Sequence, residues 1–374
     1  MRVTRLDIHQ FRPFEQVQLR PGPGLNVLVG DNGAGKTTVL EALHLMAYGR
    51  SFRGRVRDGL VRAGQPALEV FVEWEEGRHA SGQAGGSSAP PLRQRKAGLR
   101  HSGQDWDGRL DGADVAQLGE LCAALAVVTF EPGSHALVTG AADIRRRYLD
   151  WGLFHVEHQF FPTWRRYSRA LKQRNALLKT RAPLAQLDTW DHELADAGEP
   201  LSRFRQSYLD ALQPLFAALL AELAPALGES TLNYLPGWRR DEMPLADALL
   251  LARERDLLAG FTSVGPHRAD WRIQFGGIPG RDALSRGQAK LTALAALLAQ
   301  AEQFAARAGE WPVIALDDLA SELDRAHQRR VINRLIASSA QVFMTGTEPP
   351  AVLDASGHAY TLFHVEHGDV RGRP

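Results

Sequence analysis

The chain has 374 residues, of which 44% are hydrophobic and 23% charged, and its formal net charge at pH 7 is +1. Its length suits two or three lobes with a sizeable core, and its composition is ordinary for a globular protein. The sequence contains no signal-peptide core and no apolar run of about 18 residues, so we expect a cytoplasmic protein without a membrane segment. The small net charge does not by itself indicate a nucleic-acid binder.

The first part of the chain predicts strands, a phosphate-binding loop and a helix. Strands are expected over residues 3–9, 17–20 and 25–29, and a helix from Thr37. Residues 30–37 fit G-x-x-x-x-G-K-[ST], whose glycines let backbone N–H groups and the helix N-terminus face a β-phosphate. Lys36 would then lie between the β- and γ-phosphates of ATP, and Thr37 would give its hydroxyl to Mg²⁺. The predicted ATP-binding residues are Gly30, Asp31, Asn32, Gly33, Ala34, Gly35, Lys36, Thr37 and Thr38.

The next stretch predicts further strands separated by a loop. Strands are expected over residues 67–75 and 127–130. Residues 77–104 are rich in Gly, Ser and Pro without usable periodicity, which favours a loop or hairpin tip. Cys122, the single cysteine, lies in an apolar stretch and is expected to be a buried structural thiol.

Helical patterns dominate the middle of the chain, where helices are expected over residues 161–178, 184–197 and 201–223. Residues 141–182 hold ten Arg and Lys against three acidic residues, which makes this region the best candidate for a phosphate-facing surface. In the first helix, apolar residues recur every seven positions and basic residues fall on another face. Arg165, Arg169 and Lys172 are therefore candidate DNA contacts. The alternative is that they form an ordinary solvated helix face.

The last part of the chain supplies chemical partners for the phosphate-binding loop. An apolar run over residues 311–316 ends in two carboxylates, the pattern of a Walker B strand. Asp317 is predicted to hold Mg²⁺ together with Thr37, and Asp318 to orient or deprotonate the attacking water. The predicted catalytic residues are therefore Lys36, Asp317 and Asp318. Ser285, Arg286, Gly287 and Gln288 precede an Ala/Leu-rich helix, and Ser321 and Asp324 follow the Walker B strand.

These four motifs, in this order, resemble the ATPase head of the ABC superfamily. The resemblance implies an α/β fold: a P-loop NTPase head, with a mixed sheet and helices, plus an inserted, mainly helical lobe II. We predict lobe I over residues 1–126 and 291–374, and lobe II over residues 127–290, ending in the signature motif. In that superfamily the signature closes on ATP held by another subunit. The resemblance therefore places residues 285–288 in trans, and Ser321 and Asp324 in the D-loop.

Several segments narrow the resemblance to the bacterial RecF recombination-mediator family, over nearly the whole chain. Besides the motifs, they are residues 11–14, 40–42, 50–53, 146–150, 173–175 and 264–268. The resemblance implies an SMC-like head without a coiled coil, which dimerises on ATP and holds DNA at junctions of single and double strands. With RecO and RecR it would load RecA during recombinational repair, and a weak, DNA-dependent ATPase would reset it. Arg12 and Arg53 are candidates for coupling nucleotide to DNA, against the alternative of solvated arginines.

Two departures bear on the alternatives. Where relatives carry an acidic pair, this chain has Gly133 and Ser134, so the Q-loop contribution stays open. A transporter ATPase places a switch histidine after the strand at residues 342–344, and this chain has Thr345, Gly346 and Thr347 there. A transporter subunit is therefore disfavoured, and the signature motif disfavours a P-loop kinase. The main alternative is an ATP-switched, dimerising interaction module that does not itself bind DNA.

Overall fold

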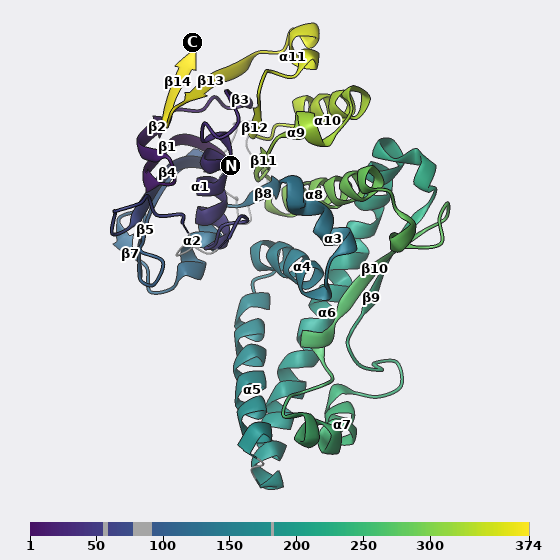
Figure 1. Ribbon diagram of the computed structural model, residues 1–374. Coiled ribbons are helices and arrows are strands. Elements are labelled where there is room, and N and C mark those ends of the chain that lie inside the picture. The colour runs from purple at the N-terminus through teal and green to yellow at the C-terminus, as the bar shows by residue number, and fades with distance from the viewer. Residues whose placement is uncertain (55–58, 78–91, 181–182, 374) are drawn as a thin grey trace, which may run out of the picture. The chain divides into compact units, whose positions relative to one another are not determined.

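The computed structural model describes residues 1–54, 59–77, 92–180 and 183–373 (Figure 1). The chain forms two compact units, each described by itself below: unit 1 contains Met1–Ser134 and Leu294–Pro374, and unit 2 contains His135–Ala293. Both ends of the chain thus lie in unit 1, and the predicted α/β head with an inserted, mainly helical lobe is confirmed.

The predicted domain boundaries need correction. The boundary after residue 126 is eight residues too early, because β8 (Val127–Phe130) pairs in parallel with β11 (Val313–Leu316) of unit 1 and extends its sheet. The boundary after residue 290 is three residues too early, because the division falls inside α8 (Arg286–Ala308).

Unit 1 is built on two six-stranded sheets. One is antiparallel and runs in the order β2-β1-β4-β5-β6-β7; the other runs in the order β14-β13-β3-β12-β11-β8 and is parallel apart from β14. The antiparallel strands are β1 (Arg2–Phe11), β2 (Phe14–Leu19), β4 (Leu68–Gly77), β5 (Leu92–His101), β6 (Trp106–Leu110) and β7 (Ala113–Asp114). The remaining strands of the other sheet are β3 (Leu25–Val29), β12 (Val342–Gly346), β13 (Tyr360–Glu366) and β14 (Asp369–Arg373).

The core of unit 1 surrounds its first helix, α1 (Lys36–Tyr48), whose residues 38–47 are all buried. A helix buried on every side needs apolar or internally paired residues throughout, and α1 has a fully buried acid, Glu41, that is paired. Cys122 is buried in α2 (Leu118–Ala124), as predicted. The other helices of this unit are residues 294–308 of α8, α9 (Leu319–Glu322), α10 (Arg325–Ala337) and α11 (Ala351–Ser356).

The prediction of a loop over residues 77–104 is wrong for its second half. Strand β5 pairs with β4 over ten positions, from Gly77↔Leu92 to Leu68↔His101. Arg93 and Arg95 lie on the same side of the strand as the buried Ala97 and Leu99, and these charged positions hide the alternation. Arg95 is 15% exposed, lies 3.6 Å from Glu76 and sits over the Trp74 ring. Residues 78–91 of the predicted loop lie outside the described residues.

Unit 2 is mainly helical and contains one pair of strands. Its helices are α3 (Ala136–Thr139), α4 (Ala142–Val156), α5 (Phe160–Thr180), α6 (Leu184–Leu223), α7 (Leu245–Ala259) and the first turns of α8. The strands β9 (Ser230–Leu235) and β10 (Asp270–Phe275) pair antiparallel. Its short 3₁₀ turns are η2 (Pro225–Leu227), η3 (Pro266–Arg268) and η4 (Arg281–Ala283), and a further turn, η1 (Pro132–His135), spans the boundary between the two units.

The two helices predicted over residues 184–197 and 201–223 are one continuous helix, α6, of 40 residues. Pro200 and Pro214 lie inside it, although proline removes a helix hydrogen bond and costs about 3 kcal/mol in a helix interior. Leucines on both sides of Pro200, Leu194 and Leu201, are buried, and so is Phe216 beyond Pro214. Burying such side chains contributes about 1.5–3 kcal/mol each, which offsets the local cost of the prolines.

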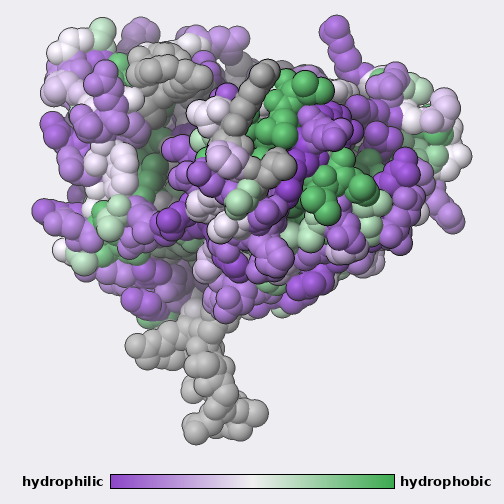
Figure 2. Space-filling model, turned by 90° about the horizontal axis from the view of Figure 1, so that it is seen from below, coloured by the Kyte–Doolittle hydropathy of each residue, from purple (hydrophilic) through white to green (hydrophobic). Residues whose placement is uncertain are grey.

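Helix α7 carries apolar side chains on its exposed side as well as on its buried side. Leu245 and Leu249 are buried, but Leu251 and Leu258 are 74% and 85% exposed. The view from below shows that such apolar groups interrupt an otherwise hydrophilic face (Figure 2).

Candidate functional site

The phosphate-binding loop joins the buried strand β3 to helix α1, and its glycines are required by its shape. Gly30, Gly33 and Gly35 all have positive φ angles, of 152°, 84° and 114°, a region that side chains disfavour. A Cβ atom on Gly30 would also collide with the carbonyl oxygen of Val365, and one on Gly35 would lie 2.8 Å from the Phe14 ring. The loop thereby leaves backbone N–H groups and the start of α1 open to an anion.

Lys36 is held by the loop itself. Its Nζ donates to the carbonyl oxygens of Gly30 and Asp31, at 2.6 and 2.8 Å. These are neutral acceptors, so a phosphate that entered the loop could attract the ammonium away from them. Lys36 therefore lies where a mobile positive charge could meet the bound group.

The next residue connects the two ends of the chain. Thr37 Oγ1 donates to Asp317 Oδ1 at 2.8 Å, across 280 positions of sequence. Asp317 follows β11, and Thr37 is in the first turn of α1. The structure thus places side by side the hydroxyl and the carboxylate that the sequence assigns to Mg²⁺.

Asp317 is buried, 4% exposed, and has a second hydroxyl partner. Thr345 Oγ1 donates to the same Oδ1 atom at 2.7 Å. Burial raises the pKa of Asp317, while the hydrogen bonds from Thr345 and Thr37 oppose that rise. A divalent cation would favour the charged form, and hard oxygen donors of this kind suit Mg²⁺. Among the described residues no group of three or more His, Cys, Asp or Glu could hold a metal, so further oxygen ligands would come from the nucleotide and water.

Asp318 occupies a special backbone position. Its φ and ψ of 51° and 42° are left-handed, which turns the chain sharply out of β11. Its N–H donates to Thr345 Oγ1 at 2.9 Å, and its Oδ2 accepts from Ser321 Oγ at 2.6 Å. A single hydroxyl, that of Thr345, therefore orients both Asp317 and Asp318.

A cavity of about 320 Å³ lies over the loop. It is lined by Arg12, Pro13, Asn32, Gly33, Gly35, Lys36, Thr37, Thr38, Arg53, Asp318 and Thr345. It therefore collects residues from five separate parts of unit 1, including both arginines that the sequence singled out. Of the predicted loop residues, Gly30, Asp31 and Ala34 lie outside its lining.

Arg12 and Arg53 belong to one network under this cavity. Arg12, at a left-handed φ of 51°, donates through Nε and Nη2 to the buried Glu41 carboxylate at 2.6 and 2.9 Å. Ser51 Oγ donates to the same carboxylate, and Ser51 Oγ accepts from the backbone N–H of Arg53 at 2.9 Å. The positions of both arginines are thus tied to α1. The sequence prediction gave no role to Glu41, Ser51 or Thr345, because nothing local marks them as partners of distant residues.

The signature residues lie in unit 2, at the start of α8. Ser285 Oγ accepts from the Gln288 N–H at 3.2 Å, and Gln288 Oε1 accepts from the Ser285 N–H at 2.9 Å, which is a reciprocal capping box. Ser285, Arg286 and Gly287 are exposed. The hydroxyl proton of Ser285 and the first N–H groups of α8 could therefore meet an external anion.

Asp324 has a structural role in this chain. It caps α10, accepting from the N–H groups of Ala326 and His327 at 2.9 Å each, and it pairs with His327 Nδ1 at 2.7 Å. The hydrogen bonds from His327 lower the pKa of Asp324. Ser321, three residues earlier, is exposed and bonds to Asp318.

The basic surface predicted over residues 141–182 is smaller than the count of charges indicates. Several of these arginines form ion pairs or hydrogen bonds within unit 2: Arg145 with Asp270, Arg146 with the Ala269 carbonyl, Arg147 with Asp143, Arg166 with Glu193, and Arg174 with Asp191 and Asp256. Arg174 is fully buried. Arg165, Arg169 and Lys172 remain exposed on α5, as their helical spacing predicts. Arg181 lies outside the described residues.

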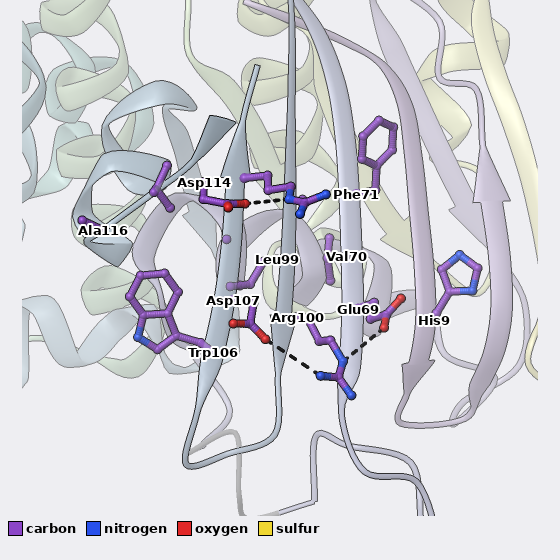
Figure 3. Close-up of a pocket in the computed structure, with 14 residues that line it drawn as sticks. His9, Glu69, Val70, Phe71, Leu99, Arg100, Trp106, Asp107, Asp114 and Ala116 are labelled. Carbon is purple, nitrogen blue, oxygen red and sulfur yellow. Dashed lines mark hydrogen bonds and ion pairs between the residues drawn. The ribbon is translucent and has the colours of Figure 1, made fainter. Parts of the chain in front are cut away.

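A larger hollow, of about 950 Å³, lies on the antiparallel sheet of unit 1 (Figure 3). Its charged residues pair with one another: Arg109 lies 2.7 Å from Asp114, and Arg100 lies 3.4 Å from Glu69 and 3.8 Å from Asp107. These are exposed cross-strand pairs on a sheet face. The hollow thus lacks a convergent set of available charges, and the smaller cavity over the phosphate-binding loop is the better candidate site.

The chain is similar to known proteins over its whole length. Residues 2–370 match the family described as RecF/RecN/SMC N terminal domain. The chain is 69% identical over 374 residues to the DNA replication and repair protein RecF of Stenotrophomonas maltophilia (strain R551-3), covering 100% of both. It is 34% identical over 371 residues to the protein of that description from Shewanella oneidensis, covering 99% of each.

Solved structures give the same picture. A structure of the recombination mediator protein RecF with ATP in the RecFOR pathway superposes with a TM-score of 0.86 at 25% identity, covering 100% of this chain and 98% of that one. An Smc head bound to the C-terminal winged-helix domain of ScpA superposes with a TM-score of 0.59 at 16% identity, covering 100% of this chain and 97% of that one, and shares the fold. No helix among the described residues is long and apolar enough to cross a membrane.

Proposed function

Because the chain belongs to the RecF family of DNA replication and repair proteins, we propose that it is an ATP-switched clamp that dimerises on DNA. The fold is that of an ABC-type ATPase head, and the family includes structures with ATP bound. The observation that carries the proposal is the hydrogen bond between Thr37 and Asp317, which assembles the two halves of a nucleotide site from opposite ends of the chain.

The nucleotide would occupy the cavity over the loop. The N–H groups of residues 33–38 would surround its phosphates, and Lys36 would exchange its two carbonyl partners for phosphate oxygens. Thr37 and Asp317 would hold Mg²⁺, which would supply positive charge beside the β- and γ-phosphates. Thr345 keeps Asp317 oriented toward that place.

Hydrolysis would be slow. Asp318 would orient the attacking water, but Asp is one methylene shorter than the Glu usual in transporter heads, and Ser321 already engages its Oδ2 at 2.6 Å. A displacement of the carboxylate by about 1 Å can lower the rate by on the order of 100-fold. Slow turnover suits a timed switch, in which hydrolysis resets the clamp.

Dimerisation would complete the site. The exposed Ser285 hydroxyl and the start of α8 in one subunit would face the γ-phosphate held by another, with Arg286, Gly287 and Gln288 beside it. ATP would thus act as part of the interface, and the D-loop residues Ser321 and Asp324 would lie near it.

The bound partner would be double-stranded DNA near junctions with single strands, contacted by Arg165, Arg169 and Lys172. Solved relatives are described as members of the RecFOR pathway, and we extend to this chain the association with RecO and RecR, and the loading of RecA. Arg12 and Arg53, which share the Glu41–Ser51 network, would couple nucleotide to DNA.

Gel filtration and a DNA mobility-shift assay, each with and without ATP and Mg²⁺, test the proposal. We expect ATP to shift the protein to a dimer and to tighten binding to double-stranded DNA. Ser285→Arg should abolish the ATP-dependent dimer while the single subunit still binds ATP; equal loss of both would argue against a role in trans. Dimerisation without any effect on DNA binding would support the interaction module that does not itself bind DNA.

A further inference from the structure

A groove between α5 and α6 of unit 2 combines an aromatic face with cationic side chains. Its volume is about 540 Å³. It is lined by Arg165, Arg166, Arg169, Thr189, Trp190 and Glu193. None of these residues belongs to the cavity over the phosphate-binding loop, which is lined by residues of unit 1.

The charges of this groove do not cancel. Arg166 Nε and Nη2 donate to the two oxygens of Glu193 at 2.6 and 2.7 Å, so the acid of the groove is neutralised by one arginine. Arg169 is exposed, and no ion pair is found for it among the described residues. The Arg165 guanidinium lies over the Phe161 ring, 5.8 Å from its centroid. The groove therefore offers positive charge beside the half-buried indole of Trp190.

The groove lies at one end of a basic stripe on α5. Arg165, Arg169, Lys172 and Lys179 follow the spacing i, i+4, i+7 and i+14, which places them on one face, and all four are exposed. The sequence of α5 contains no Asp or Glu. From Arg165 to Lys179 the helix rises by about 21 Å. A cationic track of this length suits several successive phosphates of a nucleic-acid backbone, whereas a short acidic peptide would use only part of it.

We propose that this groove binds one unpaired nucleotide of a DNA single strand, with its base against Trp190 and its phosphates on Arg165 and Arg169. The flanking backbone follows α5. The inference rests on the proposed function in taking DNA as the ligand. A base inside a duplex is already stacked on both faces, so the indole can receive an unpaired base but not an internal base pair. The groove would therefore distinguish single-stranded from double-stranded DNA without reading sequence, because every base has a π-face.

The test uses the full chain with ATP and Mg²⁺ and three labelled DNAs: a blunt duplex, a duplex with a thymine extension, and the same duplex with an abasic extension. The abasic extension keeps the phosphates and removes the bases. We expect Trp190→Leu to weaken binding of the thymine-extended duplex roughly 10-fold, because stacking on an aromatic side chain is lost. Trp190→Phe, which keeps a π-face, should bind this DNA nearly as the wild type does. Binding of the blunt duplex should change in neither variant.

The abasic DNA provides the second change of a double-mutant cycle, in which the base and the indole are removed separately and together. The wild type should lose about 10-fold on changing thymine to abasic sites, and Trp190→Leu should lose nothing further, since both changes remove one interaction. If Trp190→Leu does not fold, photo-crosslinking of the wild type to a duplex whose extension carries 5-iodouracil decides the question: a crosslink at Trp190 is expected, and crosslinks only outside the groove would overturn the inference.

Three results would overturn the inference. The first is Trp190→Leu binding the thymine extension as tightly as the wild type does. The second is an equal loss of binding to the blunt duplex, which would indicate a structural role for Trp190. The third is loss of binding of an acidic, aromatic peptide by Trp190→Leu with DNA binding retained, which would assign the groove to a protein partner. In each case ATP-dependent binding of blunt duplex by the wild type would leave the proposed function intact. Absence of that binding in the wild type would overturn both.

Discussion

Replacing Thr345 by valine removes the one hydroxyl that serves both acids of the candidate site. Thr345 Oγ1 donates to Asp317 at 2.7 Å and accepts from the Asp318 N–H at 2.9 Å. Valine has nearly the shape of threonine and suits a buried strand, so β12 should keep its backbone. The substitution therefore isolates the hydroxyl.

The size of the effect follows from these two bonds. A hydrogen bond to a charged group contributes about 1.5–3 kcal/mol, and an unsatisfied buried donor costs about 1–3 kcal/mol. Because one atom makes both bonds and Thr37 still donates to Asp317, we expect a combined loss of about 3 kcal/mol. If that loss is felt where the two acids act on ATP, turnover falls about 100-fold.

The acid limb of the pH dependence of ATP hydrolysis should also shift to higher pH in the valine variant. The hydrogen bond from Thr345 lowers the pKa of Asp317 against the effect of burial, so its removal raises that pKa further. Asp317 must be charged to hold Mg²⁺, and the valine variant should therefore lose ATPase activity at a higher pH than the wild type as the solution is acidified.

The assay is steady-state ATP hydrolysis between acidic and neutral pH, with Thr345→Ser as the matched control. Serine keeps Oγ and removes only a methyl group, so it should retain most of the activity and the wild-type acid limb. A valine variant with wild-type turnover and an unmoved acid limb would refute the reasoning, and so would a serine variant as impaired as valine.

Three further predictions concern other parts of the molecule. Asp318→Asn should keep ATP binding and prolong the ATP-bound dimer in gel filtration; an unchanged turnover rate would contradict this. Replacing Arg165, Arg169 and Lys172 of α5 by glutamine should lower the magnitude of the slope of log K for DNA binding against log salt concentration by about 2 to 3 units. An unchanged slope would assign these residues to a solvated helix face. Burial lowers the pKa of His44 and His155 to about 3 and that of His267 to about 4. These histidines therefore stay neutral in the folded chain, whereas in the unfolded chain they take up protons below the ordinary histidine pKa of about 6.5. Stability should therefore fall as pH drops from about 6.5 toward 4, by roughly 2 kcal/mol per histidine at pH 5, and His155→Phe should reduce that loss in urea unfolding measured at pH 7 and pH 5.

The parts of the site that a short segment defines could be predicted from the sequence. The loop at residues 30–37 needs glycines at positive φ, and a strand that ends in two acids delivers them to one edge of a parallel sheet. The capping box at Ser285 and Gln288 is equally local. In each case the residues that act together are within a few positions of one another, so their spacing carries the information.

Elements with weak or misleading local patterns were less predictable. Strand β5 carries Arg93 and Arg95 on the same side as the buried Ala97 and Leu99, which hides its alternation, and the pairing of Arg95 with Glu76 of β4 exists only in the folded sheet. The sequence predicted two helices, over residues 184–197 and 201–223, yet burial on both sides of Pro200 holds α6 continuous. Here tertiary packing outweighed local preference, because buried area contributes more than one lost helix hydrogen bond costs.

The sequence by itself thus determined that the chain has a phosphate-binding loop, a Walker B strand and the family to which it belongs. Only the tertiary structure decided which side chains meet: Thr345 with both acids, Arg12 with Glu41, and Arg174 with Asp191 and Asp256. A count of arginines over residues 141–182 could not separate those that face solvent from those in buried ion pairs. An ion pair depends on distances of a few ångströms between residues that the sequence separates by tens or hundreds of positions, and only the folded chain fixes those distances.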